Sequence, residues 1–273
     1  MPELPEVEFA ARQLRRWLVG RRVEEAEVDP TRITRPQPPG DVARAIAGHT
    51  LRDVQRRAKY LLLTFDHGVG VLSHLGMTGK WVIRGRGEPV RFSRARLFLP
   101  GGQVVHLCDS RMFGQLRAMP AEALRQVPVI KGLGPDPLED GLTSKELGER
   151  LRRTARPVKL ALMDQTVIAG LGNIHAAEAL YRAKIHPARA ARSLTAKEVA
   201  ALRAGIFASI RHALAAEAQS RAGEITYVEE GGPNPFRVYD RKGEVCRRCG
   251  AEIDAFTQGG RTTYFCPGCQ KKD

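Results

Sequence analysis

The stretch from Tyr60 to Leu75 reads YLLLTFDHGVGVLSHL, and it decides the fold of the first half of the chain. Two apolar runs, residues 60–65 and 70–75, flank the polar turn Asp66-His67-Gly68. Runs of this length that are joined by a short turn with a glycine predict two antiparallel strands.

The same pattern continues on both sides of this hairpin. Further strand-like runs are residues 23–28, 80–83, 95–99 and 104–108, and Pro100-Gly101-Gly102 separates the last two. Before them, apolar residues recur at helical spacing over residues 5–19, and Gly20 ends that pattern. We therefore expect an α+β protein whose N-terminal domain, residues 2–125, is an antiparallel β-sandwich or flattened barrel with flanking helices.

The second half of the chain has a helical pattern. Proline and glycine cluster over residues 127–141, which predicts a linker at residues 126–142. Thr143 with Glu146, and Thr195 with Glu198, have the spacing of a capping box at a helix start. We expect a helical domain over residues 143–236, with further helices at 157–166, 174–182 and 196–218 and a mobile loop at 220–236.

The C-terminal segment, residues 237–273, has the cysteine spacing of a zinc finger. Cys246-x2-Cys249 is followed after sixteen residues by Cys266-x2-Cys269, and four thiolates at this spacing close a tetrahedral site around one structural Zn²⁺. Cys108, in a strand-like run, is expected to be a buried apolar residue. Between the cysteine pairs, Gly259-Gly260-Arg261 predicts a hairpin tip with a cation, which is either solvated or grips a phosphate.

The composition indicates a polyanionic partner. Lys and Arg total 44 against 30 Asp and Glu, which gives a formal net charge of +14 and a pI near 10.1. We expect no signal peptide and no apolar run of about 18 residues that could span a bilayer, hence a cytoplasmic monomer without a membrane partner. Five cysteines in a reducing compartment indicate a metal site or free thiols.

The N-terminus combines a nucleophile type with carboxyl groups. Removal of Met1 would expose Pro2, whose secondary amine has an α-amino pKa of roughly 7.7 to 8.0 and is partly unprotonated at neutral pH. Such an amine can attack an electrophilic carbon and form an imine, and Glu3 and Glu6 could transfer protons beside it. The same residues also suit the start of a helix, where proline and acidic residues are favoured. The N-terminal residues alone therefore fit either a catalytic amine with nearby carboxyl groups or an ordinary helix start.

Together, several motifs resemble the formamidopyrimidine-DNA glycosylase family, which also includes endonuclease VIII. The resemblance covers nearly the whole chain. It is carried by Pro2-Glu3-Leu4-Pro5-Glu6-Val7-Glu8, Arg57-Ala58-Lys59-Tyr60-Leu61, His74-Leu75-Gly76-Met77, Asp109-Ser110-Arg111-Met112-Phe113-Gly114, Leu162-Met163-Asp164, Gly170-Leu171-Gly172-Asn173-Ile174 and the cysteine module with Arg261.

The resemblance implies a base-excision enzyme with an N-terminal β-sandwich, a helix-two-turn-helix domain and a zinc finger, which binds damaged double-stranded DNA. It implies a bifunctional glycosylase and lyase that excises oxidised purines and then cuts the strand by β,δ-elimination through a Pro2 imine. Glu3 is similar to the acid that assists opening of the sugar ring, and Glu6 to a supporting carboxylate.

The resemblance also assigns DNA contacts. Lys59, Asn173 and Arg261 match residues that clamp the phosphates beside the lesion, with His74 and Lys159 as further backbone contacts. Asn173 is also expected to be the N-cap of the helix it begins. Met77, Arg111 and Phe113 match residues that enter the duplex where the damaged base leaves the stack.

Some positions depart from the family pattern. Met112 stands where a basic residue is usual, His175 where tyrosine is frequent, and Ala177 where aspartate is frequent. The loop 220–236 also differs from the best-known loop that covers the lesion. One alternative is an endonuclease VIII-type enzyme for oxidised pyrimidines, which Pro2-Glu3-Leu4-Pro5 disfavours because glycine is usual there at the fourth position. Another is a zinc protein that binds damaged DNA without catalysis. We expect association with the nucleoid.

Overall fold

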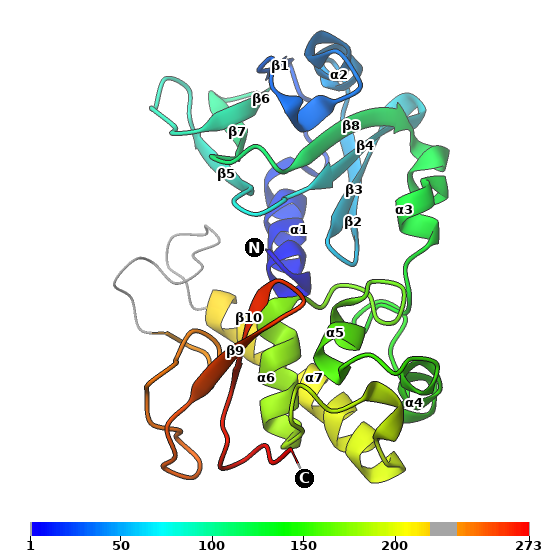
Figure 1. The fold of residues 1–273 in the computed structure, drawn as a ribbon. Helices are drawn as coiled ribbons and strands as arrows, with labels where there is room; N and C mark the ends of the chain where they lie inside the picture. Colours follow the sequence, from blue (N-terminus) through cyan, green and yellow to red (C-terminus); the bar gives the residue numbers. More distant parts are fainter. Residues whose placement is uncertain (1, 219–233, 273) are drawn as a thin grey trace. The chain divides into compact units, whose positions relative to one another are not determined.

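A computed structural model describes residues 2–218 and 234–272 (Figure 1). The chain divides into two compact units. The first runs to Gly132, inside the segment expected to be a linker. The second contains Leu133–Ala216 and the described residues from 234 onward. The mixed α and β architecture agrees with the expected fold class.

The first unit is built on two four-stranded antiparallel sheets, with strand orders β1-β6-β7-β5 and β2-β3-β4-β8. Helices α1 (Leu4–Leu18) and α2 (Pro39–Ile46) come from its N-terminal part, and the short α3 (Pro128–Lys131) ends it. The strands are β1 (Glu25–Val28), β2 (Leu51–Arg57), β3 (Tyr60–Phe65), β4 (Val69–His74), β5 (Lys80–Gly85), β6 (Ser93–Leu99), β7 (Gln103–Cys108) and β8 (Gln115–Pro120).

The predicted hairpin is present as β3 and β4, with Leu62 opposite Leu72 in the register. Cys108 is buried in β7, as expected. Four helices and strands of this unit were not predicted, namely α2, β2, β8 and the short α3, which lies in the expected linker. Strand β2 reads LRDVQRR and β8 reads QLRAMP, so each alternates apolar residues with charged or polar ones and neither has a continuous apolar run.

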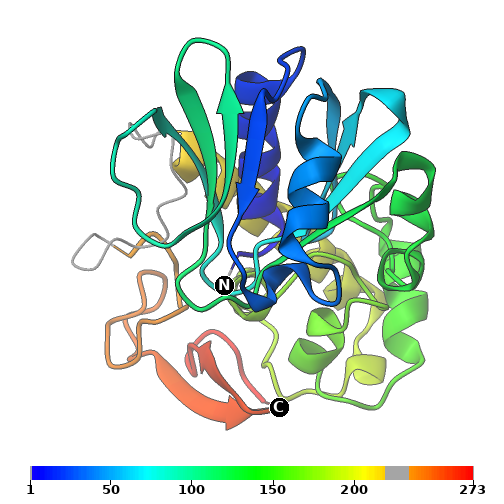
Figure 2. The same cartoon turned by 90° about the horizontal axis from the view of Figure 1, so that it is seen from above.

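Helix α1 packs against strands of both sheets of this unit, as Figure 2 shows from above. Leu4, Val7, Leu14 and Leu18 are completely buried, whereas Trp17 is only partly buried. Burying four large apolar side chains at about 1.5 to 3 kcal/mol each fixes the helix on the sheets. Its first turn, which carries the candidate catalytic residues, is therefore held by the core.

The second unit is mostly helical and ends in a two-stranded hairpin. Its elements are α4 (Ser144–Arg152), α5 (Val158–Met163), α6 (Asn173–Ala183), α7 (Ala196–Ala218), β9 (Asp254–Gln258) and β10 (Arg261–Phe265). Both predicted capping boxes are present, because Thr143 and Glu146 exchange hydrogen bonds, as do Thr195 and Glu198. Helix α5 ends three residues earlier than predicted, at Met163. There the Asp164 carboxylate accepts the Thr166 N–H at 3.0 Å and begins a turn.

Helix α7 corrects one expectation from the sequence. Its segment Ala196–Ala216 is long and apolar enough, by length and composition alone, to cross a membrane. Leu202, Ile206 and Ile210 are completely buried within the protein. The apolar character of this helix is thus accounted for by the core that it helps to form.

Candidate functional site

The N-terminus of α1 holds Glu3 and Glu6 in fixed positions. Glu3 precedes the helix, and its backbone N–H donates to Glu6 Oε2 at 2.8 Å. Both residues are only 1% exposed. Since Glu6 uses one carboxylate oxygen to fix the backbone of Glu3, it supports the residue that directly follows Pro2 in the chain.

An ion pair between a buried arginine and a partly buried glutamate connects α1 to the turn that carries Lys59. Arg56 on β2 donates through Nε to Glu8 Oε2 at 3.0 Å and through Nη1 to the Ala58 carbonyl at 3.1 Å. The Arg56 side chain is 4% exposed. Ala58 has a φ of 53°, an uncommon backbone conformation for alanine that occurs mainly in tight turns and at functional sites. The sequence motif did not reveal that Arg56 is buried.

The candidate residues of the first unit lie at one end of the β2-β3-β4-β8 sheet. Tyr60 pairs with His74, and His74 pairs with Gln115. The turn with Lys59, the segment after His74 and the loop before Gln115 therefore leave the sheet at the same end. Glu8 of α1 contacts Arg56 near this end, while Arg15 contacts the Val54 carbonyl farther along β2. The first turn of α1 consequently points toward the Lys59 turn.

His74 is held as a neutral imidazole. Its Nδ1 accepts a hydrogen bond from the Gly76 N–H at 3.1 Å, and its ring lies 4.7 Å from that of Tyr60. Burial, followed by the positive charge of Lys59, lowers the pKa of His74 to about 4. A phosphate contact by His74 would therefore be made through a neutral N–H donor.

Asp109 organises the loop that carries Arg111 and Phe113. Its carboxylate accepts hydrogen bonds from the Gly114 N–H at 2.8 Å, the Thr78 hydroxyl at 2.5 Å and the Arg111 N–H at 3.2 Å. Asp109 is 1% exposed. The loop 109–114 and the segment after His74 are thus fixed to one another through a single carboxylate, a role that the sequence motif did not reveal.

The two segments also approach each other closely through glycine. Gly76 has a φ of 61°, and a Cβ atom on it would lie 2.4 Å from the Phe113 carbonyl carbon. Only glycine can occupy this position without displacing the neighbouring backbone. Met77 and Phe113 remain 39% and 46% exposed. They are the kind of apolar side chain that could enter a base stack.

Arg32, which sequence reasoning missed, supports the same loop. It donates to the Met112 and Arg111 carbonyl oxygens, each at 2.7 Å, and its guanidinium carbon lies 4.4 Å from the centre of the Phe113 ring. The Arg111 guanidinium carbon is 5.1 Å from that centre. The carbonyl oxygen of Met112 therefore has a cationic partner within the protein, namely Arg32.

In the second unit, residues far apart in the sequence meet at the tip of the β9–β10 hairpin. The Asn173 side-chain amide donates to the Thr262 carbonyl at 3.1 Å, next to the exposed Arg261. Gly259 at the tip packs against Leu160, since a Cβ atom there would lie 2.7 Å from a Leu160 methyl carbon. The start of α6 and Arg261 are thus side by side.

One expectation for this region needs correction. The N-cap of α6 is Gly172, not Asn173, which is the first residue of the helix. Lys159 is completely buried, and its Nζ lies 2.6 Å from Thr263 Oγ1 and 3.4 Å from the Thr262 carbonyl. An amine in this position fixes the hairpin, and the expected DNA backbone contact of Lys159 stays a prediction.

The four cysteines of the second unit are arranged to bind one zinc ion. Their sulfur atoms all lie within 4.8 Å of one another, with 3.9 Å between Cys246 and Cys269 and 3.4 Å between Cys249 and Cys266. A Zn–S distance of about 2.3 Å in a tetrahedron requires sulfur atoms about 3.8 Å apart. The donor set therefore fits a closed structural Zn²⁺ site.

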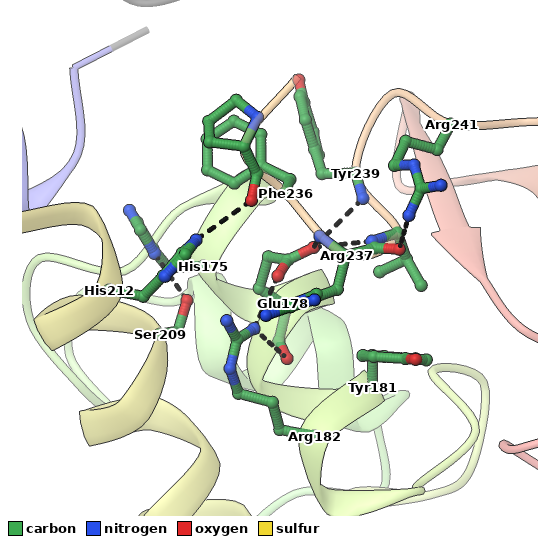
Figure 3. Close-up of polar contacts among 12 residues, drawn as sticks. His175, Glu178, Tyr181, Arg182, Ser209, His212, Phe236, Arg237, Tyr239 and Arg241 are labelled. Atoms are coloured by element: carbon green, nitrogen blue, oxygen red, sulfur yellow. Dashed lines mark hydrogen bonds and ion pairs between the residues drawn. The ribbon is translucent and has the colours of Figure 1, made fainter. Parts of the chain in front are cut away.

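Glu178 connects α6 to the chain that leads to the zinc site (Figure 3). Its Oε1 accepts the backbone N–H groups of residues 237, 238 and 239 at 2.9, 2.8 and 3.2 Å. Its Oε2 accepts from Arg182 at 2.5 Å. Glu178 is completely buried. The sequence gives no sign of this carboxylate, because a single glutamate in a helix is usually exposed.

The departures in α6 are explained by local packing. His175 is buried and its Nδ1 lies 2.8 Å from Ser209 Oγ on α7. Ala177 belongs to a buried apolar cluster with Tyr181, Val238 and Ile253, where an aspartate would be costly without a partner. The expected mobile loop lies outside the described residues over 220–233. At its end, His212 Nε2 lies 3.0 Å from the Pro235 carbonyl (Figure 3).

Comparison with known proteins gives one family for the first two parts of the chain and a zinc finger that this family shares with IleRS for the third. Residues 1–116 match the formamidopyrimidine-DNA glycosylase N-terminal domain, residues 133–223 match the formamidopyrimidine-DNA glycosylase H2TH domain, and residues 243–272 match a zinc finger found in FPG and IleRS.

Individual relatives match over the full length. Formamidopyrimidine-DNA glycosylase of Desulfitobacterium hafniense is 38% identical over 273 residues, covering 99% of this chain and 100% of the relative. That of Bacillus licheniformis is 39% identical over 277 residues, covering 100% of both.

Solved structures agree with these sequences. Lactococcus lactis Fpg (MutM), solved in complex with DNA containing an oxidised pyrimidine, has a TM-score of 0.89 and 31% identity, covering 99% of this chain and 100% of that chain. The MutM (Fpg) protein of Thermus thermophilus has a TM-score of 0.82 and 34% identity, covering 100% of both.

Proposed function

Since the chain belongs to the formamidopyrimidine-DNA glycosylase family, a family of base-excision DNA repair enzymes, we propose that Pro2 is the nucleophile of this enzyme. Its amine attacks C1′ of the damaged nucleotide, the glycosidic bond breaks, and the oxidised purine leaves with a proton. The C1′–O4′ bond of the sugar ring then breaks, O4′ takes up a proton, and the iminium that forms at C1′ makes the sugar protons acidic. Loss of these protons then breaks the bonds to the 3′ and 5′ phosphates in turn, so that the strand is cut on both sides.

Glu3 is proposed as the acid that assists opening of the sugar ring. The observation that carries this proposal is the hydrogen bond from the Glu3 N–H to Glu6, which fixes the residue next to Pro2 at the start of a buried helix. A positioned carboxyl group contributes about 10²- to 10⁴-fold to such a step. Glu6 is proposed as its support and not as a second proton donor.

Lys59, Asn173 and Arg261 are proposed to bind the phosphates beside the lesion, with His74 as a neutral donor. Met77, Arg111 and Phe113 are proposed to fill the duplex when the base flips out. The shared carboxylate of Asp109 supports this assignment, because it joins the two segments that carry all three side chains. The structural Zn²⁺ holds the hairpin below Arg261 and takes no part in bond breaking.

The relatives favour oxidised purines such as 8-oxoguanine and formamidopyrimidines over the endonuclease VIII-type alternative. The matching solved structure with an oxidised pyrimidine makes a direct comparison worthwhile. Excision from duplexes with 8-oxoguanine or thymine glycol should be faster for 8-oxoguanine. The enzyme acts on DNA, and we place it at the nucleoid in the cytoplasm.

Borohydride trapping tests the covalent step. Reduction of the imine on 8-oxoguanine DNA should leave an adduct that intact-mass and peptide analysis assign to residue 2. A protein with an extra residue ahead of Pro2 should give no adduct, and a normal yield from it would rule out the mechanism. Glu3→Gln should slow excision of 8-oxoguanine but retain cutting of a preformed abasic site. Equal loss on both substrates would exclude Glu3 as the acid of the first step.

A further inference from the structure

The second unit contains a pocket of about 380 Å³ close to the zinc site. It is lined by Tyr181, Arg182, Arg237, Arg247 and Arg248. The residues come from the end of α6, from the segment that follows residue 234, and from the turn between the first two zinc cysteines. Four of the five lining residues are arginines, and none is acidic. Pockets that bind small ligands are usually mostly apolar, so this composition requires an explanation.

Over residues 2–216 and 234–272, acidic groups compensate one of these charges, that of Arg182. Arg182 pairs with Glu178, which is completely buried and accepts three backbone N–H groups with its other oxygen (Figure 3). Arg248 stacks on the Tyr181 ring at 4.3 Å and donates to the Tyr181 carbonyl at 3.0 Å. Over residues 2–216 and 234–272, no carboxylate lies within ion-pair distance of Arg237, Arg247 or Arg248.

The zinc site does not account for the arginines. Four thiolates around Zn²⁺ carry a net charge of −2, and a nearby cation can offset it. However, Cys246 Sγ has the Tyr181 hydroxyl at 3.3 Å and accepts the Arg248 backbone N–H at 3.4 Å. Within the described chain, none of the four guanidinium groups is hydrogen-bonded to a sulfur atom, and no cysteine lines the pocket. Within residues 2–216 and 234–272, the side chains of Arg237 and Arg247 make no hydrogen bond or ion pair, so these two guanidinium groups can bind a ligand.

We propose that this pocket binds a phosphate-type oxyanion at a site separate from the hairpin tip. A guanidinium group offers planar pairs of donors that match the oxygens of a phosphate, and several unpaired guanidinium groups together strengthen such binding. The hairpin separates the pocket from Arg261, because Cys266 follows the base of the hairpin while Arg261 faces Gln258 at its tip. Five residues of strand correspond to about 15 Å. The anion is either a backbone phosphate of bound DNA or a free phosphate compound.

Calorimetry with inorganic pyrophosphate tests the site. The full-length zinc-loaded protein should bind pyrophosphate in a component that the double variant Arg237→Ala/Arg247→Ala weakens by about tenfold or more, the loss typical of charge-assisted hydrogen bonds. Arg192→Ala, which removes an exposed arginine elsewhere in the unit, is the matched control and should bind like the unchanged protein. Equal pyrophosphate affinity in the unchanged protein and the double alanine variant overturns the proposal, as does an equal loss in the control.

A second variant separates anion binding from zinc retention. Arg237→Lys/Arg247→Lys keeps both charges but removes the paired donors, so it should retain zinc and still bind pyrophosphate more weakly. Zinc content is measured for every variant. If the alanine variant loses zinc, the lysine variant decides the question, and unchanged pyrophosphate affinity in it overturns the proposal.

Two duplexes distinguish the sources of the phosphate. Affinity for 13-base-pair and 30-base-pair duplexes with a tetrahydrofuran site is measured against salt concentration. If DNA supplies the anion, the alanine variant should reduce the slope of log affinity against log salt concentration by about 0.9 for each lost phosphate contact. This reduction should be seen with the 30-base-pair duplex only. If a free phosphate compound is the ligand, both slopes stay unchanged while pyrophosphate binding is lost. Both results support an oxyanion site, because the loss of pyrophosphate binding in the alanine variant is established before the duplexes are compared.

Discussion

The side-chain amide of Asn173 donates a hydrogen bond to the carbonyl oxygen of Thr262, 89 residues later in the chain and 3.1 Å away. Because Thr262 directly follows Arg261, this bond ties the first residue of α6 to the cation at the hairpin tip. Lys159 donates to the neighbouring Thr263 hydroxyl at 2.6 Å. The position of Arg261 therefore depends on the helical part of the second unit as well as on zinc.

Asn173→Ala should lower the affinity for tetrahydrofuran-containing DNA by about tenfold, the value of one good hydrogen bond. The losses of affinity caused by Asn173→Ala and Arg261→Ala should not add, because loss of the hydrogen bond from Asn173 to Thr262 also displaces Arg261. Residues that share a partner typically couple by about 0.5 to 3 kcal/mol. A double-mutant cycle on equilibrium binding measures this coupling, and strict additivity would show that the two side chains act independently.

The elements of the fold were predictable where one local signal was sufficient. The hairpin of β3 and β4 has two apolar runs and a turn, and the capping boxes of α4 and α7 are each contained in four residues. Strands β2 and β8 were missed because their mixed side chains become partly buried only through pairing with β3 and β4.

The zinc ligands were predictable from their spacing, whereas the residues that support the candidate site were not. Arg56, Asp109 and Glu178 are all buried charged residues whose partners lie in other segments, such as Glu8 on α1 for Arg56. A sequence shows the charge but not the partner. Lys159 is a further case, since a lysine is usually exposed and only the packing of the hairpin reveals that this one is buried.

Asp109→Ala should loosen the loop 109–114, which carries Arg111 and Phe113, without removing a proposed catalytic group. The change leaves the Gly114 N–H without its acceptor, at a cost of about 1 to 3 kcal/mol, and releases the Thr78 hydroxyl. We expect a lower unfolding temperature, faster amide exchange at residues 111–114, and slower excision of 8-oxoguanine. Cutting of a preformed abasic site should suffer less, because no base has to be flipped out. Unchanged amide exchange in this loop would contradict the role of Asp109.

Zinc removal should unfold the β9–β10 hairpin locally, because metal binding and folding share one free energy in small four-thiolate sites. A strong chelator, or Cys249→Ser, should then increase amide exchange at Thr262 and Thr263 and weaken DNA binding. Amide exchange in the first unit should remain unchanged. DNA affinity that survives complete zinc loss would show that Arg261 is not a phosphate clamp.

Acidification should destabilise the first unit through His74. Burial, followed by the charge of Lys59, lowers the pKa of His74 to about 4 in the folded protein, against about 6.5 in the unfolded chain. Between these values the unfolded state binds more protons, so the stabilising contribution is present above about pH 6.5 and is lost as the pH falls through about 4. Urea unfolding across this range should show a pH dependence that His74→Gln reduces.

The neutral state of the His74 imidazole also predicts how this residue contacts DNA. A neutral imidazole donates a hydrogen bond but neutralises no charge, so His74→Gln should leave the salt slope of DNA binding unchanged. Lys59→Gln, by contrast, should lower the slope by about 0.9 if Lys59 binds one phosphate. A slope that falls equally in both variants would show that His74 is protonated in the complex.

Arg111 should select the base opposite the lesion. Its backbone is fixed, because its N–H donates to Asp109 Oδ1 at 3.2 Å and its carbonyl accepts from Arg32 at 2.7 Å. Its guanidinium group lies 5.1 Å from the Phe113 ring centre and offers only donors. Cytosine presents two acceptors on its pairing edge, whereas adenine places an amino donor beside N1. 8-Oxoguanine opposite cytosine should therefore be excised faster than opposite adenine, with about 1 to 3 kcal/mol of discrimination.

Single-turnover rates on the two duplexes measure this preference. Arg111→Ala should bring the cytosine-to-adenine ratio toward one, because it removes the donors that distinguish the bases. Phe113→Ala is the matched control from the same loop, and it should slow excision on both duplexes while leaving their ratio unchanged, since an aromatic wedge does not read the partner base. An Arg111→Ala enzyme that keeps the full ratio would falsify the assignment, and the preference would then have to arise from a residue outside the loop 109–114.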